Sequence, residues 1–163
     1  MSNRIYIMGP IGSGKTTFSK KLSEKLKIDR YELDKIIYDD INGNVKRDIK
    51  EVQRLFNNII KKDSWIIEDV GRSKFIKGRE KADIIYYIKI SKIRAYYRVV
   101  RRWIRQRIGI EEFGYPPSLK QLKYFITTVN SYYKKEKDKI NSLKIYGDKV
   151  IFVNTNMINK IGG

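Results

Sequence analysis

The chain has 163 residues, 41% of them hydrophobic, and its 36 lysines and arginines against 18 acids give a formal net charge of +18. It contains neither cysteine nor histidine, which excludes disulfides, thiolate or imidazole metal sites and the usual histidine general base. A polyanionic partner, either nucleic acid or a phosphorylated substrate, would explain the charge, and a merely lysine-rich composition is the alternative.

No apolar run approaches the roughly 20 residues that a membrane-spanning helix needs. The residues before the first glycine form too short an apolar run for a signal peptide. We therefore expect one cytoplasmic domain over residues 1–163, with no membrane partner.

Strands and helices are predicted to alternate along the chain. Strands are expected at 4–8, 28–33, 64–70, 82–90 and 149–155, and helices from residue 14, around 52–60, over 92–107 and from 119 to about 140. Asn42-Gly43 marks a turn, and the segment 109–118 separates the last two helices. This alternation predicts an α/β fold in which a parallel sheet has helices on both faces.

The helix over 92–107 has two features at helical spacing. Its large apolar side chains are expected to face the core, and they are Ile93, Tyr96, Tyr97, Val100, Trp103 and Ile104. It also carries six arginines, at positions 94, 98, 101, 102, 105 and 107. Phosphoryl transfer needs positive groups around the moving phosphoryl, so we expect at least two of them to contact phosphate, with a solvated basic face as the alternative.

The segment Gly9-Pro10-Ile11-Gly12-Ser13-Gly14-Lys15-Thr16 matches G-x-x-x-x-G-K-[ST], the phosphate-binding P-loop. It follows an apolar strand and opens an amphipathic helix, as anion binding by backbone N–H groups requires. The predicted ATP-binding residues are Gly9, Gly12, Ser13, Gly14, Lys15, Thr16, Thr17 and Arg98. Lys15 would reach the outer phosphates and Thr16 would offer its hydroxyl to Mg²⁺. The alternative is an ordinary Gly/Ser turn.

Acids lie at the predicted ends of two strands, where ligands bind in parallel sheets. Asp34 follows the second strand, and Glu68 and Asp69 end the third. Either Asp34 or Glu68 could organise Mg²⁺ or orient an attacking hydroxyl, and Asp34 could instead cap a helix. Arg72, just past the third strand, is a candidate to hold an anionic acceptor.

The whole chain resembles the P-loop kinases known as DNA topology modulation proteins (FlaR-related), relatives of the adenylate and shikimate kinases. The resemblance rests on "IMGPIGSGKTTFSKKLSEKL", "YELD", "WIIEDVGRS", "ADIIYYIKISKIRAYYRVVRR" and "GYPPSLKQLKYFI". It implies a three-layer P-loop NTPase fold with a five-stranded parallel sheet, adenylate-kinase-like, with a short lid at about 108–117.

The same resemblance implies roles for individual residues. Asp34 would be the aspartate beside the acceptor pocket, and Arg98 and Arg102 would be the arginines entering the lid. Glu68 stands where such proteins commonly carry the aspartate of an "IIDGN" segment, so "EDV" is a departure. The lid also lacks the arginine–proline pairing of many relatives, and no motif specifies the acceptor.

The leading hypothesis is an ATP- and Mg²⁺-dependent kinase acting on a nucleotide, a nucleoside or another hydroxylated metabolite. Its catalytic residues would be Lys15, Asp34, Arg98 and Arg102, with Asp34 and Arg72 at the acceptor and Thr16 and Glu68 at the metal. Asn154 and Thr155 are weaker candidates to touch the base.

Two alternatives involve nucleic acid. A nucleotide-regulated DNA-binding protein would need a basic patch away from the loop, for which "YYKKEKDK" at 132–139 is the local candidate. An exposed helix end with i,i+3 and i,i+4 ion pairs is the other interpretation of that segment. A polynucleotide 5′-kinase would combine both activities.

Overall fold

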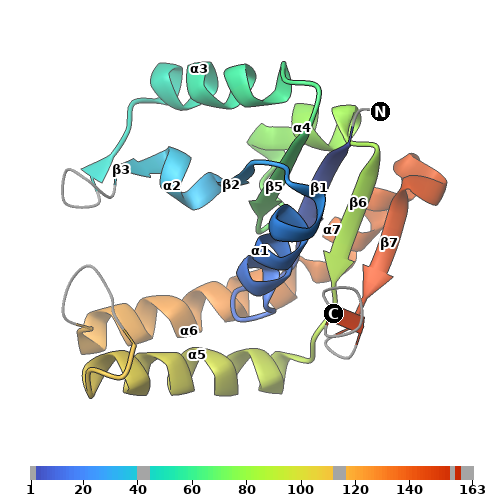
Figure 1. Cartoon of the computed structure of the whole chain (residues 1–163). Helices are drawn as coiled ribbons and strands as arrows, with labels where there is room; N and C mark the ends of the chain where they lie inside the picture. Colours follow the sequence, from blue (N-terminus) through green and yellow to red (C-terminus); the bar gives the residue numbers. More distant parts are fainter. Residues whose placement is uncertain (1–2, 40–44, 112–116, 155–156, 159–163) are drawn as a thin grey trace.

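The computed structural model describes residues 3–39, 45–111, 117–154 and 157–158. Five parallel strands form the central sheet in the order β2-β5-β1-β6-β7 (Figure 1). The strands are β1 (Arg4–Met8), β2 (Arg30–Glu32), β5 (Trp65–Asp69), β6 (Ile84–Ile88) and β7 (Val150–Val153). This confirms the predicted five-stranded parallel sheet, with strands slightly shorter than the sequence indicated.

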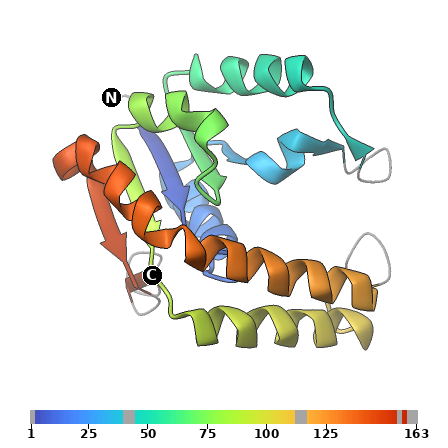
Figure 2. The same cartoon turned by 180° about the vertical axis from the view of Figure 1, so that it is seen from behind.

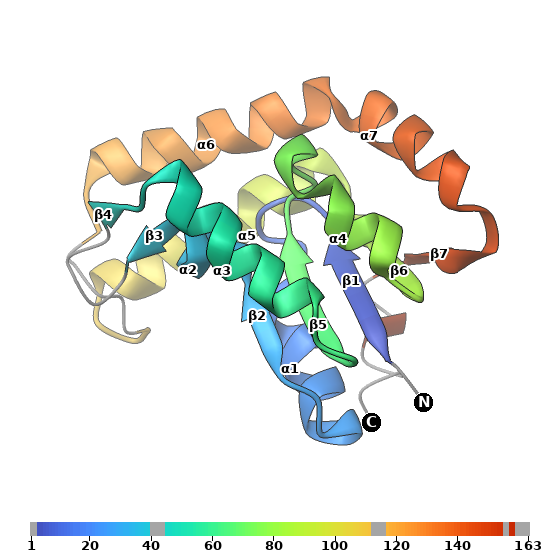
Figure 3. The same ribbon diagram turned by 90° about the horizontal axis from the view of Figure 1, so that it is seen from above.

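Helices cover both faces of the sheet, giving three layers. On one face pack α2 (Leu33–Ile37), α3 (Ile49–Ile60), α4 (Ile76–Lys81) and α7 (Glu136–Leu143). On the other face pack α1 (Lys15–Leu26), α5 (Lys92–Arg107) and α6 (Leu119–Lys134). Figure 2 shows α5 and α6 lying side by side, and they pack against each other. Seen from above in Figure 3, α6 and α7 follow each other along one side of the molecule.

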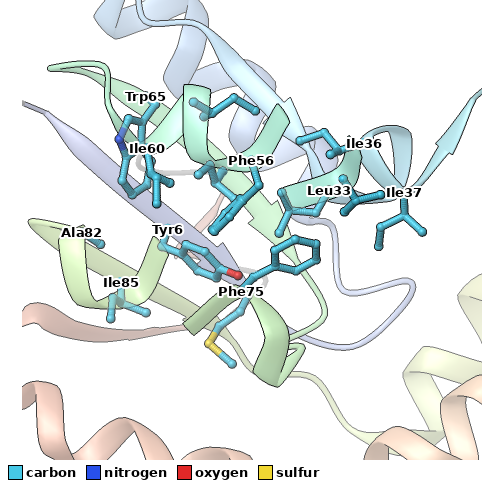
Figure 4. Packing of buried hydrophobic residues seen from close by; sticks show 14 of the residues in the cluster. Tyr6, Leu33, Ile36, Ile37, Phe56, Ile60, Trp65, Phe75, Ala82 and Ile85 are labelled. Atoms are coloured by element: carbon cyan, nitrogen blue, oxygen red, sulfur yellow. The ribbon is translucent and has the colours of Figure 1, made fainter. Parts of the chain in front are cut away.

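Strand β1 contributes side chains to the hydrophobic core on each face of the sheet. Tyr6 and Met8 point to one face and Ile5 and Ile7 to the other, as strand alternation requires, and all four are buried. Figure 4 shows Tyr6 packed among Phe56, Phe75 and Ile85. A strand buried on both faces explains the continuous apolar run read from the sequence.

Several elements of the structure go beyond the sequence prediction. The short helix α2 and an antiparallel pair of two-residue strands, β3 (Tyr38–Asp39) and β4 (Val45–Lys46), fill the segment between β2 and α3. A 3-10 turn at Ser73–Phe75 and α4 lie between β5 and β6. The helix expected from 119 to about 140 is two helices, separated at Lys135. The predicted turn at 42–43 lies outside the described residues.

The bounds of α5 are as predicted, but only part of its predicted core stripe packs inward. Tyr96 packs against the core, and Val100 and Trp103 are half-buried. Ile93, Tyr97 and Ile104 are 80%, 64% and 46% exposed. The buried positions are instead Ala95, Val99 and Gln106, on the opposite side of the helix. Small side chains occupy that side because α5 approaches the loop after β1 closely: a Cβ added to Gly12 would lie 3.4 Å from both the Ala95 carbonyl and Val99 Cγ2.

Among the described residues, no helix combines the length and the apolar character required to cross a bilayer.

Candidate active site

The loop between β1 and α1 has the backbone of an anion-binding loop. Gly14 is the N-cap residue of α1 with φ +96°, a conformation that favours glycine, and no side chain caps the first turn. The first N–H groups of α1 therefore have no partner within the helix and are available to bind an anion above the loop. Gly9 is required for close approach, since an added Cβ would lie 2.7 Å from the Ile88 carbonyl oxygen of β6.

Lys15 folds over this loop. Its Nζ donates to the carbonyl oxygens of Gly9 and Pro10 at 3.1 and 2.9 Å. Burial lowers the pKa of Lys15, while the nearby charges of Glu68, Asp34 and Asp69 act in the opposite direction. The ammonium group therefore lies between the loop and the acids at the ends of β2 and β5, within electrostatic reach of both.

Glu68, near the end of β5, is tied to the first turns of α1. Thr16 Oγ1 and Ser19 Oγ donate to its two carboxylate oxygens at 3.0 and 3.1 Å, and Arg30 lies 3.7 Å away. Its side chain is 6% exposed, and burial together with the charge of Glu32 raises its pKa. Sequence analysis named Thr16 and Glu68 but missed Ser19, although Ser19 lies one helical turn after Thr16 and so on the same face.

The two predicted catalytic arginines of α5 lie in different surroundings. Arg98 Nη1 donates to the carbonyl oxygens of Gly12 and Ser13 at 3.1 and 3.2 Å, so it lies on the phosphate loop. Arg102, one turn further along, is half-exposed and its Nε lies 3.4 Å from Glu111. The structure thus brings Arg98 to the loop and pairs Arg102 with Glu111. The predicted lid lies only partly within the described residues, since 112–116 are outside them.

Two other predicted loop residues differ in exposure. The Ser13 side chain is fully buried, and its hydroxyl has no hydrogen-bond partner in the described part of the chain. Thr17 is exposed in the first turn of α1. Asn154 Oδ1 accepts from the Met157 N–H at 3.0 Å, and Thr155 lies outside the described residues.

Asp34 and Arg72 form an ion pair at the ends of β2 and β5. Arg72 Nη2 lies 2.5 Å from Asp34 Oδ1, and Arg72 Nη1 lies 2.5 Å from Asp69 Oδ1. Burial opposes ionisation of Arg72, but the charges of Asp69 and Asp34 outweigh it and raise its pKa. Asp34 lies within α2, whose N-cap is Glu32, so it meets Arg72 rather than capping the helix.

A set of largely buried groups holds the segment that carries Arg72, an arrangement that sequence analysis did not predict although it named Asp69. Asp69, whose side chain is fully buried, also accepts from the Arg72 backbone N–H at 2.6 Å and from the Tyr6 hydroxyl at 3.2 Å. Lys139 Nζ of α7 donates to the carbonyl oxygens of Val70 and Gly71 at 3.0 and 2.7 Å. Arg79 Nη1 of α4 donates to the Arg72 carbonyl at 3.1 Å. We call this set, Asp69, Tyr6, Arg79 and Lys139, the loop clamp.

The segment proposed for nucleic-acid contact has its tyrosines and Lys139 turned inward, while Lys134, Lys135 and Lys137 are exposed. Tyr132 is 6% exposed and donates to the Tyr87 hydroxyl, and Tyr133 donates to the Ile90 carbonyl at 2.8 Å. Lys139 belongs to the loop clamp. These side chains are therefore occupied by contacts within the fold.

No protein-family model matches the sequence, and no curated protein matches it. Solved structures do. Over 96% of this chain and 89% of the other, it is similar to a shikimate kinase from Acinetobacter baumannii in complex with shikimate, with a TM-score of 0.60 and 17% identity. The fold is that of the P-loop kinases. A gluconokinase from Sinorhizobium meliloti 1021 matches 94% of this chain with 82% of its own, at a TM-score of 0.54 and 12% identity. At identities this low, the similarity to solved P-loop kinases establishes the fold alone. It confirms the expected fold of the adenylate/shikimate kinase type.

Proposed function

We propose that the protein is an ATP-dependent kinase that transfers the γ-phosphoryl group to a hydroxyl of a small molecule. One arrangement carries this proposal: Lys15 lies between a P-loop on one side and the Asp34–Arg72 pair on the other, close enough for Asp34 to influence its pKa. A phosphate donor and a hydroxyl acceptor would meet across that ammonium group. The P-loop kinase fold supports the same class of reaction.

On the donor side, the loop amides, Lys15 and Arg98 would bind the triphosphate. Hydroxyl and carboxylate oxygens are the ligands that Mg²⁺ prefers, and the Thr16–Glu68 pair supplies one of each at the helix N-terminus. These residues fit the ion, and when bound it would neutralise charge on the phosphate oxygens. Burial favours the protonated form of Glu68, so binding at this site would improve as its proton leaves.

On the acceptor side, Asp34 would orient the hydroxyl and accept its hydrogen bond. In the transfer the acceptor oxygen would bond to the γ-phosphorus, the bond from that phosphorus to the β,γ-bridging oxygen would break to leave ADP, and the hydroxyl proton would pass to Asp34 and from there to solvent. Arg98, and Arg102 if it exchanges Glu111 for phosphate, would stabilise the charge that develops on the three phosphoryl oxygens. The protein's contribution is positioning and electrostatics, as phosphoryl transfer requires.

We infer further that the acceptor carries an anionic group. Lys74 lies within electrostatic reach of Arg72 and Lys46, since burial and then the charges of Arg72 and Lys46 lower the pKa of Lys74. Arg72 pairs with Asp34, whose side chain is 64% exposed, and Lys74 lies within electrostatic reach of the same carboxylate. A carboxylate or phosphate on the acceptor would bind there, which is the charge that Arg72 recognises best.

The test is ATP consumption by the purified protein with Mg²⁺ and separate pools of nucleosides, nucleotides, hydroxylated acids including shikimate and gluconate, and short oligonucleotides. Lys15→Ala is the control for loop-dependent chemistry. An acceptor-dependent rise in ADP that is lost in Lys15→Ala supports the proposal and names the acceptor. ATP binding without stimulation by any pool would contradict it.

The oligonucleotide pool distinguishes a small-molecule kinase from the remaining alternative, a polynucleotide 5′-kinase. The resemblance to topology modulation proteins and the net charge of +18 would suggest that alternative. Stimulation by oligonucleotides alone would favour it. The inward-facing tyrosines of 132–139 speak against stacking on bases at that segment.

A further inference from the structure

The outward face of α5 carries an apolar stripe that is mostly exposed within the part of the chain that the structure describes. Its residues are Ile93, Tyr97, Val100 and Ile104, followed by Ile108 just past the helix end, and we call them the α5 stripe. Ile93 is 80% exposed, Tyr97 64% and Ile108 61%. Large apolar side chains aligned on one exposed face are typical of an interaction site. We propose that the α5 stripe binds an acidic amphipathic helix of a partner protein.

Spacing argues for a helix as the occupant. Successive members of the stripe lie four, three and four residues apart up to Ile104, which is the a/d pattern of a coiled-coil seam. The stripe is narrow, as a seam is, whereas a helix that lies on a bilayer or a core presents a broader apolar face. From Ile93 to Ile108 it extends about 22 Å, enough for about four turns of a partner helix.

Charge argues for an acidic partner. Arginines 94, 101 and 105 border one edge of the stripe, and α5 contains no acidic residue. Arg105 lies 3.6 Å from Glu111, but within the described ranges Arg94 and Arg101 make no ion pair with a carboxylate. A second copy of this chain would bring arginines opposite arginines, so an acidic helix is the complementary partner and self-association is disfavoured.

The side chains also argue against a nucleic acid as the occupant. Single strands bind by stacking bases on aromatic rings, and four of the five stripe residues are isoleucine or valine. Tyr97 is the one aromatic member. The stripe also lies opposite the side of α5 that approaches Gly12, so it neither adds to nor depends on the proposed kinase site.

The probe is a synthetic four-heptad peptide with leucine at a and d and glutamate at e and g. A scrambled peptide of the same composition controls for charge alone. Binding to the full chain is followed by calorimetry at physiological salt and by tryptophan emission. Trp65 is fully buried, so a change in emission would report on Trp103, which flanks the stripe. We expect the patterned peptide to bind at least about tenfold more tightly than the scrambled one.

Variants locate the binding surface. Tyr97→Ser/Ile104→Ser should weaken the patterned peptide by at least about tenfold, because two exposed anchors are lost. Ile49→Ser/Ile145→Ser removes two isoleucines from elsewhere that are more exposed than Tyr97 and Ile104, at 70% and 75%, and should change affinity less than about twofold. Arg94→Glu/Arg101→Glu should weaken the acidic peptide and strengthen one with lysine at e and g. Circular dichroism melts confirm that each variant is folded.

Three results would overturn the proposal: no binding of the patterned peptide, equal binding of the scrambled peptide, or equal binding by Tyr97→Ser/Ile104→Ser. Three parallel measurements test the other possible occupants. They are binding to anionic vesicles, binding to a single-stranded oligonucleotide, and sedimentation of the chain alone to detect self-association. If the stripe variant loses only one of those associations, the stripe serves a bilayer, a nucleic acid or a second copy instead, and the acidic-helix assignment is wrong.

Discussion

Replacing Lys139 with methionine removes one anchor of the segment that carries Arg72. Lys139 Nζ donates to the carbonyl oxygens of Val70 and Gly71, and its ammonium lies 5.1 Å from the centre of the Tyr132 ring. Methionine keeps an unbranched apolar side chain over Tyr132 and deletes the charge. The two carbonyl oxygens are then left without this donor, while the Asp69 contacts of Arg72 remain.

The expected loss is smaller than the sum of the two hydrogen bonds. A bond to a charged group contributes about 1.5–3 kcal/mol. Burial lowers the pKa of Lys139, and the charges of Arg79 and Arg72 act in the same direction. The free energy needed to keep the ammonium charged in the fold therefore offsets part of what its two hydrogen bonds contribute. We therefore expect a net destabilisation of about 1–3 kcal/mol, which in a chain of this size lowers Tm by roughly 3–10 °C.

The functional effect should be confined to the acceptor. Arg72 loses part of its support, so KM for an anionic acceptor should rise, while ATP affinity should stay unchanged because Lys139 contacts no residue of the phosphate loop. The assays are thermal and urea unfolding, amide hydrogen exchange over residues 70–73, and titration with ATP. Lys137→Met, at an exposed position of the same helix, is the matched control. If Lys139→Met melts like the control and its 70–73 amides exchange no faster, the loop-clamp reasoning is refuted.

Further predictions concern the predicted site residues themselves. The folded pKa of Glu68 exceeds its ordinary value of 4.5, so the free energy of unfolding should fall as pH rises from about 4.5 through the folded pKa. Urea unfolding at several pH values should show this slope, and Glu68→Gln should flatten it. Lys15→Met should abolish ATP binding in calorimetry yet shift Tm by no more than about 4 °C, because burial already penalises the charge that is removed. Asp34→Asn should lower kcat by about 10²–10⁴-fold if Asp34 assists proton removal; an unchanged kcat would assign Asp34 to holding Arg72 alone.

The phosphate loop could be predicted from the sequence because its parts are contiguous. Six residues between β1 and α1 set the turn, the helix start and the position of Lys15, and Thr16 follows within the same turn. The strands of the sheet were equally local, since each is a short apolar run between breaks. Glu68 could be placed near the loop because parallel strands end at one edge, and its bond to Thr16 follows from that register.

The orientation of α5 could not be predicted in this way. Apolar side chains identify a stripe, but the face that packs is decided by how closely the neighbouring backbone approaches. Here the phosphate loop and α6 admit Ala95 and Val99, while Ile93, Tyr97 and Ile104 are left outside. Side chains that the pattern assigned to the core thus form an exposed surface, which is the observation on which the α5 stripe proposal rests.

The two halves of the site differ in how they are assembled, and this difference has a testable consequence. The phosphate side comes from one segment, whereas Arg72 depends on β5, α4 and α7, with Lys139 lying 68 residues from Gly71 in the chain. Contacts this distant leave no local pattern, which is why the loop clamp escaped sequence analysis. Because the two halves share few supporting residues, substitutions in the loop clamp should change acceptor use while leaving ATP affinity intact, and substitutions at Thr16 or Gly14 should do the reverse.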